Sequence, residues 1–529
     1  MHKHTVVAWF LLLAVIGGLI GSSACMAQEE PCYGGTLRYA TLGEVPMLDG
    51  MLVSQDLATS IIHHVMEGLF AFDASNEPVP FLLESYEVEN DGKLVLLHLR
   101  QGVLFHNADE MVADDVAASL SRWLQYGTRG RLVGEYTDNV LVTDRYTVEM
   151  HMKKAFGPLT SLLGFAGGGC LIYPKEIVET AGAEPIAAEN MIGTGPYKFV
   201  EWIPGRHILL TAFEDYCART EEPSGYSGRR TAYIKNIEYI PLSEVNARVM
   251  GLRSGDFNYA ERIPADLYDG LKQAPGIQTL VANDPSFGEL IPNTRQGIMS
   301  NLTMRKAVRA ALDMQPILQA AYGPEDLWDA NGSFYPIGNF WYTLAGTETY
   351  DQPDLDKVKQ LLEEAGYNGE PIHYMTSTDY KNFYDESVII TAQLSKAGFN
   401  IDLQVYDWPT VANRRAKPEL WDLFQTMHGL VPDPSLLTCM NSNWPSLETS
   451  WDTPELTELK QHFMSSTARN ERFAAWEALQ KYIYEYVPVI ETGHFSFVNI
   501  ASDELHGLGT PSHPVKLFPY FWNVWIDEE

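Results

Sequence analysis

The chain has 529 residues, of which 45% are hydrophobic and 20% are charged, so it encodes a large globular protein and not a disordered polymer. Its 37 Lys and Arg residues stand against 69 Asp and Glu residues, which gives a formal net charge of −32. A surface of that charge repels nucleic-acid phosphates and anionic lipids, so we expect no nucleic-acid partner. The length fits about three or four domains, or one large interwoven unit.

The first residues have the pattern of an export signal. Lys3 precedes an apolar run over residues 6–20, and small side chains follow it at 21–24. This run is shorter than the roughly 20 residues that a helix needs to span a bilayer. We therefore predict that residues 1–27 are a cleaved signal peptide. Cleavage before Cys25 would instead leave that cysteine available for lipid attachment, and the sequence leaves both alternatives open.

Four cysteines remain after cleavage at residue 27: Cys32, Cys170, Cys217 and Cys439. An exported protein meets an oxidising compartment, where four cysteines allow three disulfide connectivities. The sequence does not favour one of them. No two of these thiols have the close spacing of a zinc site, so we expect no metal site.

Strand and helix patterns alternate from the start of the mature chain. Residues 35–40, 93–99 and 146–152 have strand character, and the third of these stretches alternates apolar and polar side chains with a period of two. Between the second and third strands, Asp114 and Asp115 can cap a helix whose apolar residues recur at helical spacing. Such a helix is suited to cover one face of a sheet.

The same alternation continues in the second half of the chain. Three more helices are predicted there: over 304–312 after a Thr303 cap, from Asp356 to Gly366, and over 386–396 before Gly398. No flexible linker, internal repeat or low-complexity tract separates these elements. The pattern therefore predicts a mixed α/β architecture whose domains are tightly joined and discontinuous in sequence.

No motif places catalytic side chains at the spacing that a reaction requires. His64 and Glu67 begin a zinc-helix pattern but lack its second histidine. Residues 193–196 have glycines like those of a dinucleotide loop, but Pro196 removes an amide donor from it. We assign no catalytic residue and no cofactor. A secreted hydrolase with two carboxylates far apart in the sequence remains an alternative.

Several segments, taken together and in order, carry a family resemblance. They are residues 34–40, 112–120, 193–197, 301–313 and 361–367. In this arrangement the chain resembles the family 5 solute-binding proteins of ABC importers, a group that contains oligopeptide-, dipeptide- and nickel-binding proteins. The resemblance covers nearly all of the mature chain.

The resemblance implies an α/β fold of the periplasmic-binding-protein type, a class II two-lobed clamshell with an extra inserted domain. The implied division is a signal peptide at 1–27, a discontinuous lobe I at 28–65, 195–275 and 490–529, an inserted domain at 66–194, and lobe II at 276–489. Such a protein is a periplasmic receptor and not an enzyme. It captures a small solute as a monomer and delivers it to an ABC permease in the cytoplasmic membrane.

One segment departs from the pattern of the peptide-binding members. In those proteins the stretch that matches residues 426–434 contains an Asp that pairs with the α-amino group of the peptide, and here that position is Leu430. A buried ammonium without a carboxylate is costly, so an ordinary peptide is a poor ligand on this reading. A peptide receptor in which another carboxylate takes this role stays the alternative. Asp433, between two prolines, is expected to fix a turn.

The resemblance also implies which residues face the ligand. Arg295 is the candidate for a carboxylate or phosphate contact, because its guanidinium can bind two oxygens at once. Trp408 offers an aromatic face for stacking, and His428 offers a hydrogen bond. The full set of candidate ligand-binding residues is Met51, Ser54, Asn293, Arg295, Trp408, Met427, His428, Gly429 and Leu430.

Overall fold

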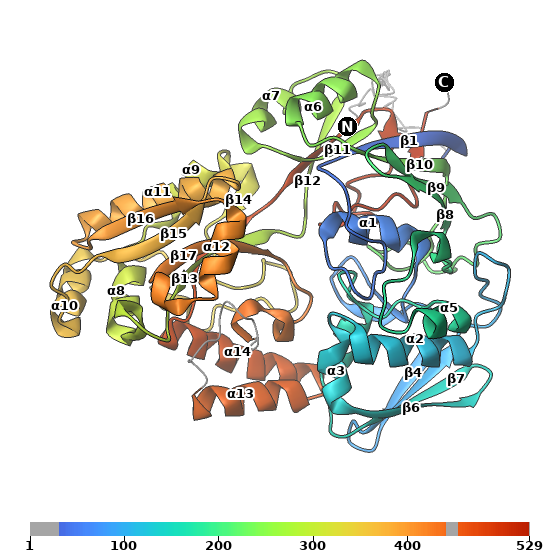
Figure 1. Ribbon diagram of the computed structural model, residues 1–529, viewed down its shortest axis with the longest axis horizontal. Helices are drawn as coiled ribbons and strands as arrows, with labels where there is room; N and C mark the ends of the chain where they lie inside the picture. The colour runs from blue at the N-terminus through green and yellow to red at the C-terminus, as the bar shows by residue number, and fades with distance from the viewer. Residues whose placement is uncertain (1–30, 441–452, 528–529) are drawn as a thin grey trace, which may run out of the picture. The chain divides into compact units, whose positions relative to one another are not determined.

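The structure is a computed structural model that describes residues 31–440 and 453–527 (Figure 1). The predicted signal peptide and Cys25 lie outside these residues. Within the described ranges, no helix combines the length and the apolar character of a membrane span. From Cys32 onward the chain forms one unit, and the fold below is that of this unit.

The first large sheet contains seven strands in the order β12-β19-β11-β1-β10-β9-β8. Their bounds are β1 Gly34–Thr41, β8 Tyr197–Ile203, β9 His207–Ala212, β10 Ile234–Pro241, β11 Tyr259–Ile263, β12 Ile277–Val281 and β19 Val498–Ser502. The predicted first strand is confirmed as β1, which pairs in parallel with both β10 and β11. Helices α1 (Asp56–Val65), α6 (Val245–Ser254) and α7 (Tyr268–Lys272) pack on this sheet.

A smaller sheet lies in the segment between β1 and β8, in the order β4-β5-β7-β6. Its strands are β4 Leu83–Glu89, β5 Leu94–Leu99, β6 Thr137–Asp144 and β7 Thr147–Met152, and its helices are α2 Ala113–Tyr126, α3 Gly130–Tyr136, α4 Leu159–Gly164 and α5 Lys175–Ala181. The predicted strands over 93–99 and 146–152 and the helix between them are confirmed. Val116, Leu120 and Trp123 are fully buried, and they belong to one apolar core with Leu37 and Tyr39 of the first sheet. This segment therefore forms a single body with the first lobe.

The second large sheet has six strands in the order β14-β18-β13-β17-β15-β16 (Figure 1). Their bounds are β13 Ser286–Pro292, β14 Trp328–Asp329, β15 Ile372–Ser377, β16 Ile401–Tyr406, β17 Leu423–Gly429 and β18 Ile490–Phe495. One core joins this sheet to α8 Leu302–Ala310, α9 Met314–Tyr322, α10 Leu355–Ala365 and α11 Lys381–Lys396. A second core joins it to α13 Pro454–Ser465 and α14 Arg469–Tyr486. The remaining elements are α12 Trp408–Arg415 and the short paired strands β2 Phe70–Phe72, β3 Pro78–Pro80, β20 Leu505–His506 and β21 Trp525–Ile526.

The starts of the three later helices differ from the prediction. Helix α8 is capped by Asn301, whose side chain accepts a hydrogen bond from the amide of Thr303, so the predicted Thr303 cap is wrong. The cap of α10 is Asp354, because its carboxylate accepts from the amide of Lys357. Helix α11 begins at Lys381 and not at residue 386. The predicted ends hold better, since Gly366 has the left-handed conformation that terminates a helix.

The chain crosses between the two large sheets twice, in residues 282–285 and 496–497. The two crossing segments are joined by a hydrogen bond from the amide of Ala282 to the carbonyl of Phe497 at 3.0 Å. The sequence placed the lobe boundaries at 275/276 and 489/490, but β12 pairs with β19 of the first sheet and β18 pairs with β13 of the second. We propose to move both boundaries into the crossing segments.

The disulfide bonds that the sequence allows are not formed among the described cysteines. Cys170, Cys217 and Cys439 are free thiols, so none of the three connectivities open to four cysteines is formed. Cys170 and Cys439 are buried in apolar cores, and burial raises the pKa of both thiols. Both thiols therefore stay protonated and pack as small apolar side chains.

A buried carboxyl in the second lobe gives stability a pH dependence. The Glu386 side chain is fully buried and accepts hydrogen bonds from Tyr322 Oη at 2.5 Å and Thr492 Oγ1 at 3.2 Å. Burial raises its pKa from 4.5 to about 7. Between these two pH values the folded protein holds a proton that the unfolded chain has released. The contribution of this carboxyl to stability is therefore fully present below pH 4.5 and is lost as the pH rises to 7.

We expect this carboxyl to lower the free energy of unfolding by about 3 kcal/mol over that range, and Glu386→Gln to remove the effect. The measurement is urea unfolding of wild type and variant at several pH values. The free energies of unfolding of the two proteins should differ by an amount that changes with pH. A difference that is the same at every pH would contradict the role assigned to Glu386.

Candidate functional site

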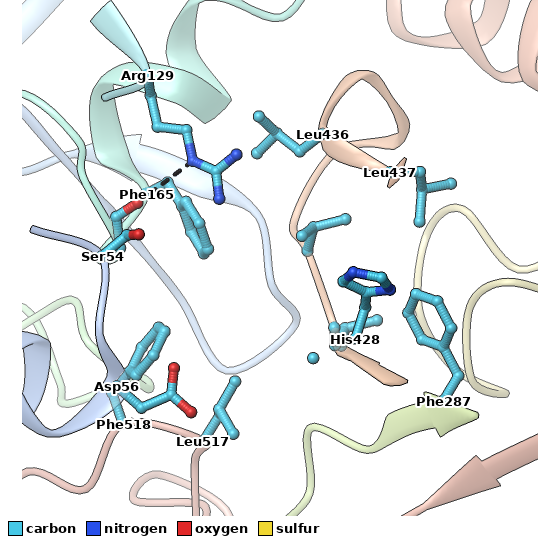
Figure 2. Close-up of a pocket in the computed structure, with 14 residues that line it drawn as sticks. Ser54, Asp56, Arg129, Phe165, Phe287, His428, Leu436, Leu437, Leu517 and Phe518 are labelled. Atoms are coloured by element: carbon cyan, nitrogen blue, oxygen red, sulfur yellow. Dashed lines mark hydrogen bonds between the residues drawn. The ribbon is translucent and has the colours of Figure 1, made fainter. Parts of the chain in front are cut away.

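A cavity of about 240 Å³ lies where the two lobes face each other. Figure 2 shows its lining, with Ser54, Asp56, Arg129, Phe165, Leu517 and Phe518 on one side and Phe287, His428, Leu436 and Leu437 on the other. Gly167 completes the first side, and Gly429, Leu430 and Val431 complete the second. The lining therefore draws on both bodies of the protein.

The second lobe supplies its part of the lining from the edge where β13 begins and β17 ends. The two strands are antiparallel, and Phe287 lies directly opposite His428. Cross-strand partners have side chains on the same face of a sheet, and here the two ring centroids are 6.2 Å apart. The chain then leaves β17 through residues 430–437, which form the rest of this wall.

Residues 430–437 are held in place by a buried ion pair. Asp433 is fully buried, and its carboxylate contacts the Arg472 guanidinium of α14 at 2.9 and 3.0 Å. It also accepts a hydrogen bond from the amide of Ser435 at 3.0 Å, which fixes the turn that the sequence predicts. Trp341 donates its indole hydrogen to the carbonyl of Pro432 at 3.0 Å. The wall is therefore a rigid part of the second lobe.

The first lobe brings an aromatic floor and two charged groups to the cavity. The rings of Phe165 and Phe518 are 6.2 Å apart, although these residues are distant in the sequence. Asp56, at the start of α1, forms an ion pair with Arg262. Arg129 reaches the cavity from the residue before α3, and burial lowers the pKa of its guanidinium.

The imidazole of His428 is oriented by the buried carboxylate of Glu289. Its Nδ1 lies 2.5 Å from the carboxylate of Glu289, which is almost completely buried. A second buried acid, Glu491, lies opposite Glu289 on β18, and burial together with the charge of Glu289 raises the pKa of Glu491. The Glu289 contact fixes the imidazole ring, so His428 is a positioned polar group in an otherwise apolar wall.

Four of the predicted ligand residues lie together at this cavity: Ser54, His428, Gly429 and Leu430. Met51 is fully buried. Its carbonyl accepts a hydrogen bond from the amide of Thr128 at 2.9 Å, which fixes the backbone just before Arg129. Met427 points to the other face of β17, where Asn382 Nδ2 lies 3.7 Å from its sulfur. Neither methionine lines the cavity.

The structure does not bring Asn293, Arg295 and Trp408 into the lining. Asn293 follows the last residue of β13, at the opposite end from Phe287, and donates to the carbonyls of Pro418 at 2.7 Å and Trp421 at 2.9 Å. Arg295 is exposed in the same loop. Trp408 packs against Tyr380 and Phe383, with centroid distances of 5.3 and 5.6 Å. Strand direction explains the positions of Asn293 and Arg295, because the cavity lies at the beginning of β13 and not at its end. Trp408 follows β16, which is separated from β17 by β15, so its distance from the cavity is lateral.

The sequence did not indicate most of the lining. Arg129, Phe165, Phe287, Leu517 and Phe518 come from four separate stretches of chain, none of which has a motif. Leu436 and Leu437 lie two and three residues beyond the segment that the family resemblance marked and could have been found by extending it. Among the described residues, no group of three or more His, Cys, Asp or Glu side chains could hold a metal ion.

Comparisons with known proteins agree on one family. The family model described as "Bacterial extracellular solute-binding proteins, family 5 Middle" matches residues 77–443. The chain is 26% identical to the "Probable peptide ABC transporter periplasmic-binding protein y4tO" of Sinorhizobium fredii, over 97% of both chains. It is 25% identical to the oligopeptide-binding protein AppA of Bacillus subtilis, over 76% of this chain and 74% of the relative.

Solved structures agree with the observed fold. The substrate-binding protein CtaP of Listeria monocytogenes superposes with a TM-score of 0.82 at 20% identity, over 94% of this chain and all of the other. At this level of identity the likeness concerns the fold, which is the two-lobed α/β arrangement expected from the sequence.

Proposed function

Because the chain belongs to family 5 of the bacterial extracellular solute-binding proteins, we propose that this receptor of an ABC importer captures its solute in the cavity between the two lobes. The receptor role is that of the family, whose members bind solutes for transport and do not transform them. The observation that carries the choice of site is the lining, which comes from both lobes. Contacts that a solute makes with both sides favour the closed arrangement over an open one.

The two crossing segments are suited to act as the hinge of this closure. They are short, and they are the places where the chain passes from one large sheet to the other. A closed receptor presents a surface that an open one does not, and the permease in the cytoplasmic membrane can distinguish the two. We propose that the protein acts as a monomer in the periplasm. Intact mass of the mature protein would distinguish cleavage at residue 27 from lipidation at Cys25.

The cavity is poorly suited to the amino group of an ordinary peptide. Asp56 is the one acidic residue among its described lining, and its charge is already paired with Arg262. Leu430 occupies the position where the peptide-binding members carry an acid, and it lines the cavity. An ammonium group bound here would lose water without gaining a carboxylate. The names of two relatives favour a peptide receptor as the second candidate.

We expect short peptides with a free amino group not to raise the melting temperature of the protein, because no unpaired acid awaits them. A thermal-shift screen should include free and N-acetylated peptides, oligosaccharides, opine-like compounds, aromatic acids and metal complexes. A ligand that binds only the folded protein raises its stability by mass action. Stabilisation that requires the free amino group would establish the peptide receptor, and consumption of the stabilising compound would establish a hydrolase.

A further inference from the structure

We propose that Arg129 is the anion-binding group of the cavity and that the solute is a small amphipathic molecule with one carboxylate and no ammonium group. This proposal rests on the receptor function proposed above and specifies the class of its ligand. It follows from the charges and contacts of the lining residues, which leave one cation of the cavity without an acidic partner.

Local contacts hold Arg129 at the cavity. The residue before it, Thr128, donates its amide to the carbonyl of Met51 at 2.9 Å and its hydroxyl to the carbonyl of Leu52 at 3.1 Å. The Arg129 Nε donates to the carbonyl of Gly167 at a long distance of 3.5 Å. Its guanidinium carbon lies 5.7 Å from the centre of the Phe165 ring. Figure 2 shows the guanidinium above Phe165 and pointing toward Leu436 on the other side.

The other ionisable side chains of the cavity each have a protein partner. Asp56 forms its ion pair with Arg262, and His428 contacts Glu289. No acidic side chain of the described residues forms an ion pair with Arg129. The charge of Arg129 is therefore uncompensated in this part of the molecule, although the whole chain carries a formal net charge of −32.

Five other arginines are almost fully buried among the described residues, and three of them pair with acids, whereas Arg248 and Arg305 donate to backbone carbonyls. Arg122 pairs with Asp49 at 2.7 Å, Arg230 with Glu67 at 3.1 Å, and Arg472 with Asp433 at 2.9 Å. A desolvated guanidinium without such a partner is unfavourable, and a ligand carboxylate can supply both the charge and two acceptor oxygens. Arg129 is half-buried and donates to one backbone carbonyl at 3.5 Å, so it has fewer partners than any of these five arginines, and an anion can reach it from the cavity.

The rest of the lining requires an apolar body. Phe165, Leu517 and Phe518 lie on the side of Arg129, and Phe287, Leu436 and Leu437 lie across the cavity. The cavity volume of about 240 Å³ suits a small molecule. His428 is the polar side chain of the far wall. A carboxylate at Arg129 with an aromatic or branched aliphatic body between the two apolar walls satisfies all of these groups.

The first test compares acids with their neutral amides. The probes are N-acetyl-L-phenylalanine, N-acetyl-L-leucine, phenylacetate and indole-3-acetate, each with its primary amide, measured by thermal shift and calorimetry at millimolar concentration. We expect at least one acid to bind and its amide to fail. Arg129→Gln should weaken the bound acid by about 30-fold, because a partner of a desolvated ion pair is lost. Arg129→Lys should retain part of the affinity, and the control Arg295→Gln, outside the cavity, should retain all of it.

Failure of all four acids, or an acid bound equally by Arg129→Gln, would overturn the proposal. A different outcome is that X-ray scattering shows an amide or amine probe closing the lobes of wild type and of Arg129→Gln to the same extent. That result would overturn the anion site but leave the receptor function intact. A probe that binds without any change in scattering would count against the receptor function itself.

The second test needs no ligand. Because Arg129 has no acidic partner, the unliganded Arg129→Gln protein should melt at the same temperature as wild type or higher. The matched variant Arg122→Gln removes a buried partner of Asp49 and should melt several degrees lower. If Arg129→Gln lowers the melting temperature as much as Arg122→Gln does, Arg129 serves the fold and the proposal is wrong.

Discussion

Leucine in place of Gly157 is expected to hold the two lobes apart and to weaken ligand binding by about 3 kcal/mol, or roughly 100-fold. Gly157 follows β7 in the first body, and its amide donates to the carbonyl of Met464 in α13 of the second lobe at 2.8 Å. A Cβ atom at this position would lie 2.0 Å from the carbonyl oxygen of Ser466 and 2.8 Å from Nε of Arg472. The backbones can approach this closely only because residue 157 has no side chain.

A second interlobe contact lies near the first. Glu77, just before β3, forms an ion pair with Arg469 at the start of α14, and the Arg469 guanidinium lies 3.8 Å from the centre of the Phe340 ring. Both contacts join the first body to the same end of the α13–α14 pair. We therefore infer that they act as a latch that is made when the lobes close.

The Gly157→Leu variant is measured by calorimetry with a ligand found in the screen and by X-ray scattering with and without it. Gly270→Leu is the matched control, because a Cβ atom there meets nothing within 4 Å. The control should close and bind like wild type. A Gly157→Leu protein that binds normally and shows the closed scattering profile would refute the latch. A large loss of stability without ligand would show a permanent interface.

Methionine in place of Arg472 is expected to lower the free energy of unfolding by about 3–5 kcal/mol. The Asp433 carboxylate is fully buried and would remain there without its cationic partner. Arg472 also lies over the rings of Phe463 and Trp341, at 4.5 and 5.0 Å from their centres. Its loss therefore removes charge compensation and packing from the segment that forms one wall of the cavity.

Denaturant unfolding and ligand titration of Arg472→Met would measure both consequences. The double variant Asp433→Asn with Arg472→Met removes both charges, and the side-chain oxygen of the introduced asparagine can still accept from the amide of Ser435. The double variant should therefore recover most of the lost stability. If the single variant loses less than about 1 kcal/mol, the pair is not a main support of this wall.

Arg472 connects the two predictions. It pairs with Asp433 behind the cavity wall, and the backbone at Gly157 packs against its side chain. The latch and the wall thus share one support in the second lobe. We infer that closure of the lobes at Gly157 and completion of the cavity at residues 430–437 occur together.

The amino-acid sequence by itself determined the α/β class, several element positions and the receptor family. These features depend on local patterns, such as the alternation over 146–152 and the cap-and-glycine signals of α10. Helix starts were less certain because Asn301, Thr303 and their neighbours are all acceptable caps, and only the observed hydrogen bond chooses among them. The family resemblance predicted that residues at the end of β17 face the ligand, because these residues lie in a segment that matches the family pattern.

Only the tertiary structure decided which side chains meet at the cavity. Met427 and His428 are neighbours in the sequence, but alternation along β17 puts them on opposite faces. The family resemblance pointed to Arg295, and no motif marks Arg129. The direction of β13 takes Arg295 away from the cavity, while the packing of the inserted segment brings Arg129 to it. The lining joins residues from 54 to 518 through contacts between separate elements. Local sequence encodes the elements, but such long-range contacts depend on how all of them pack at once.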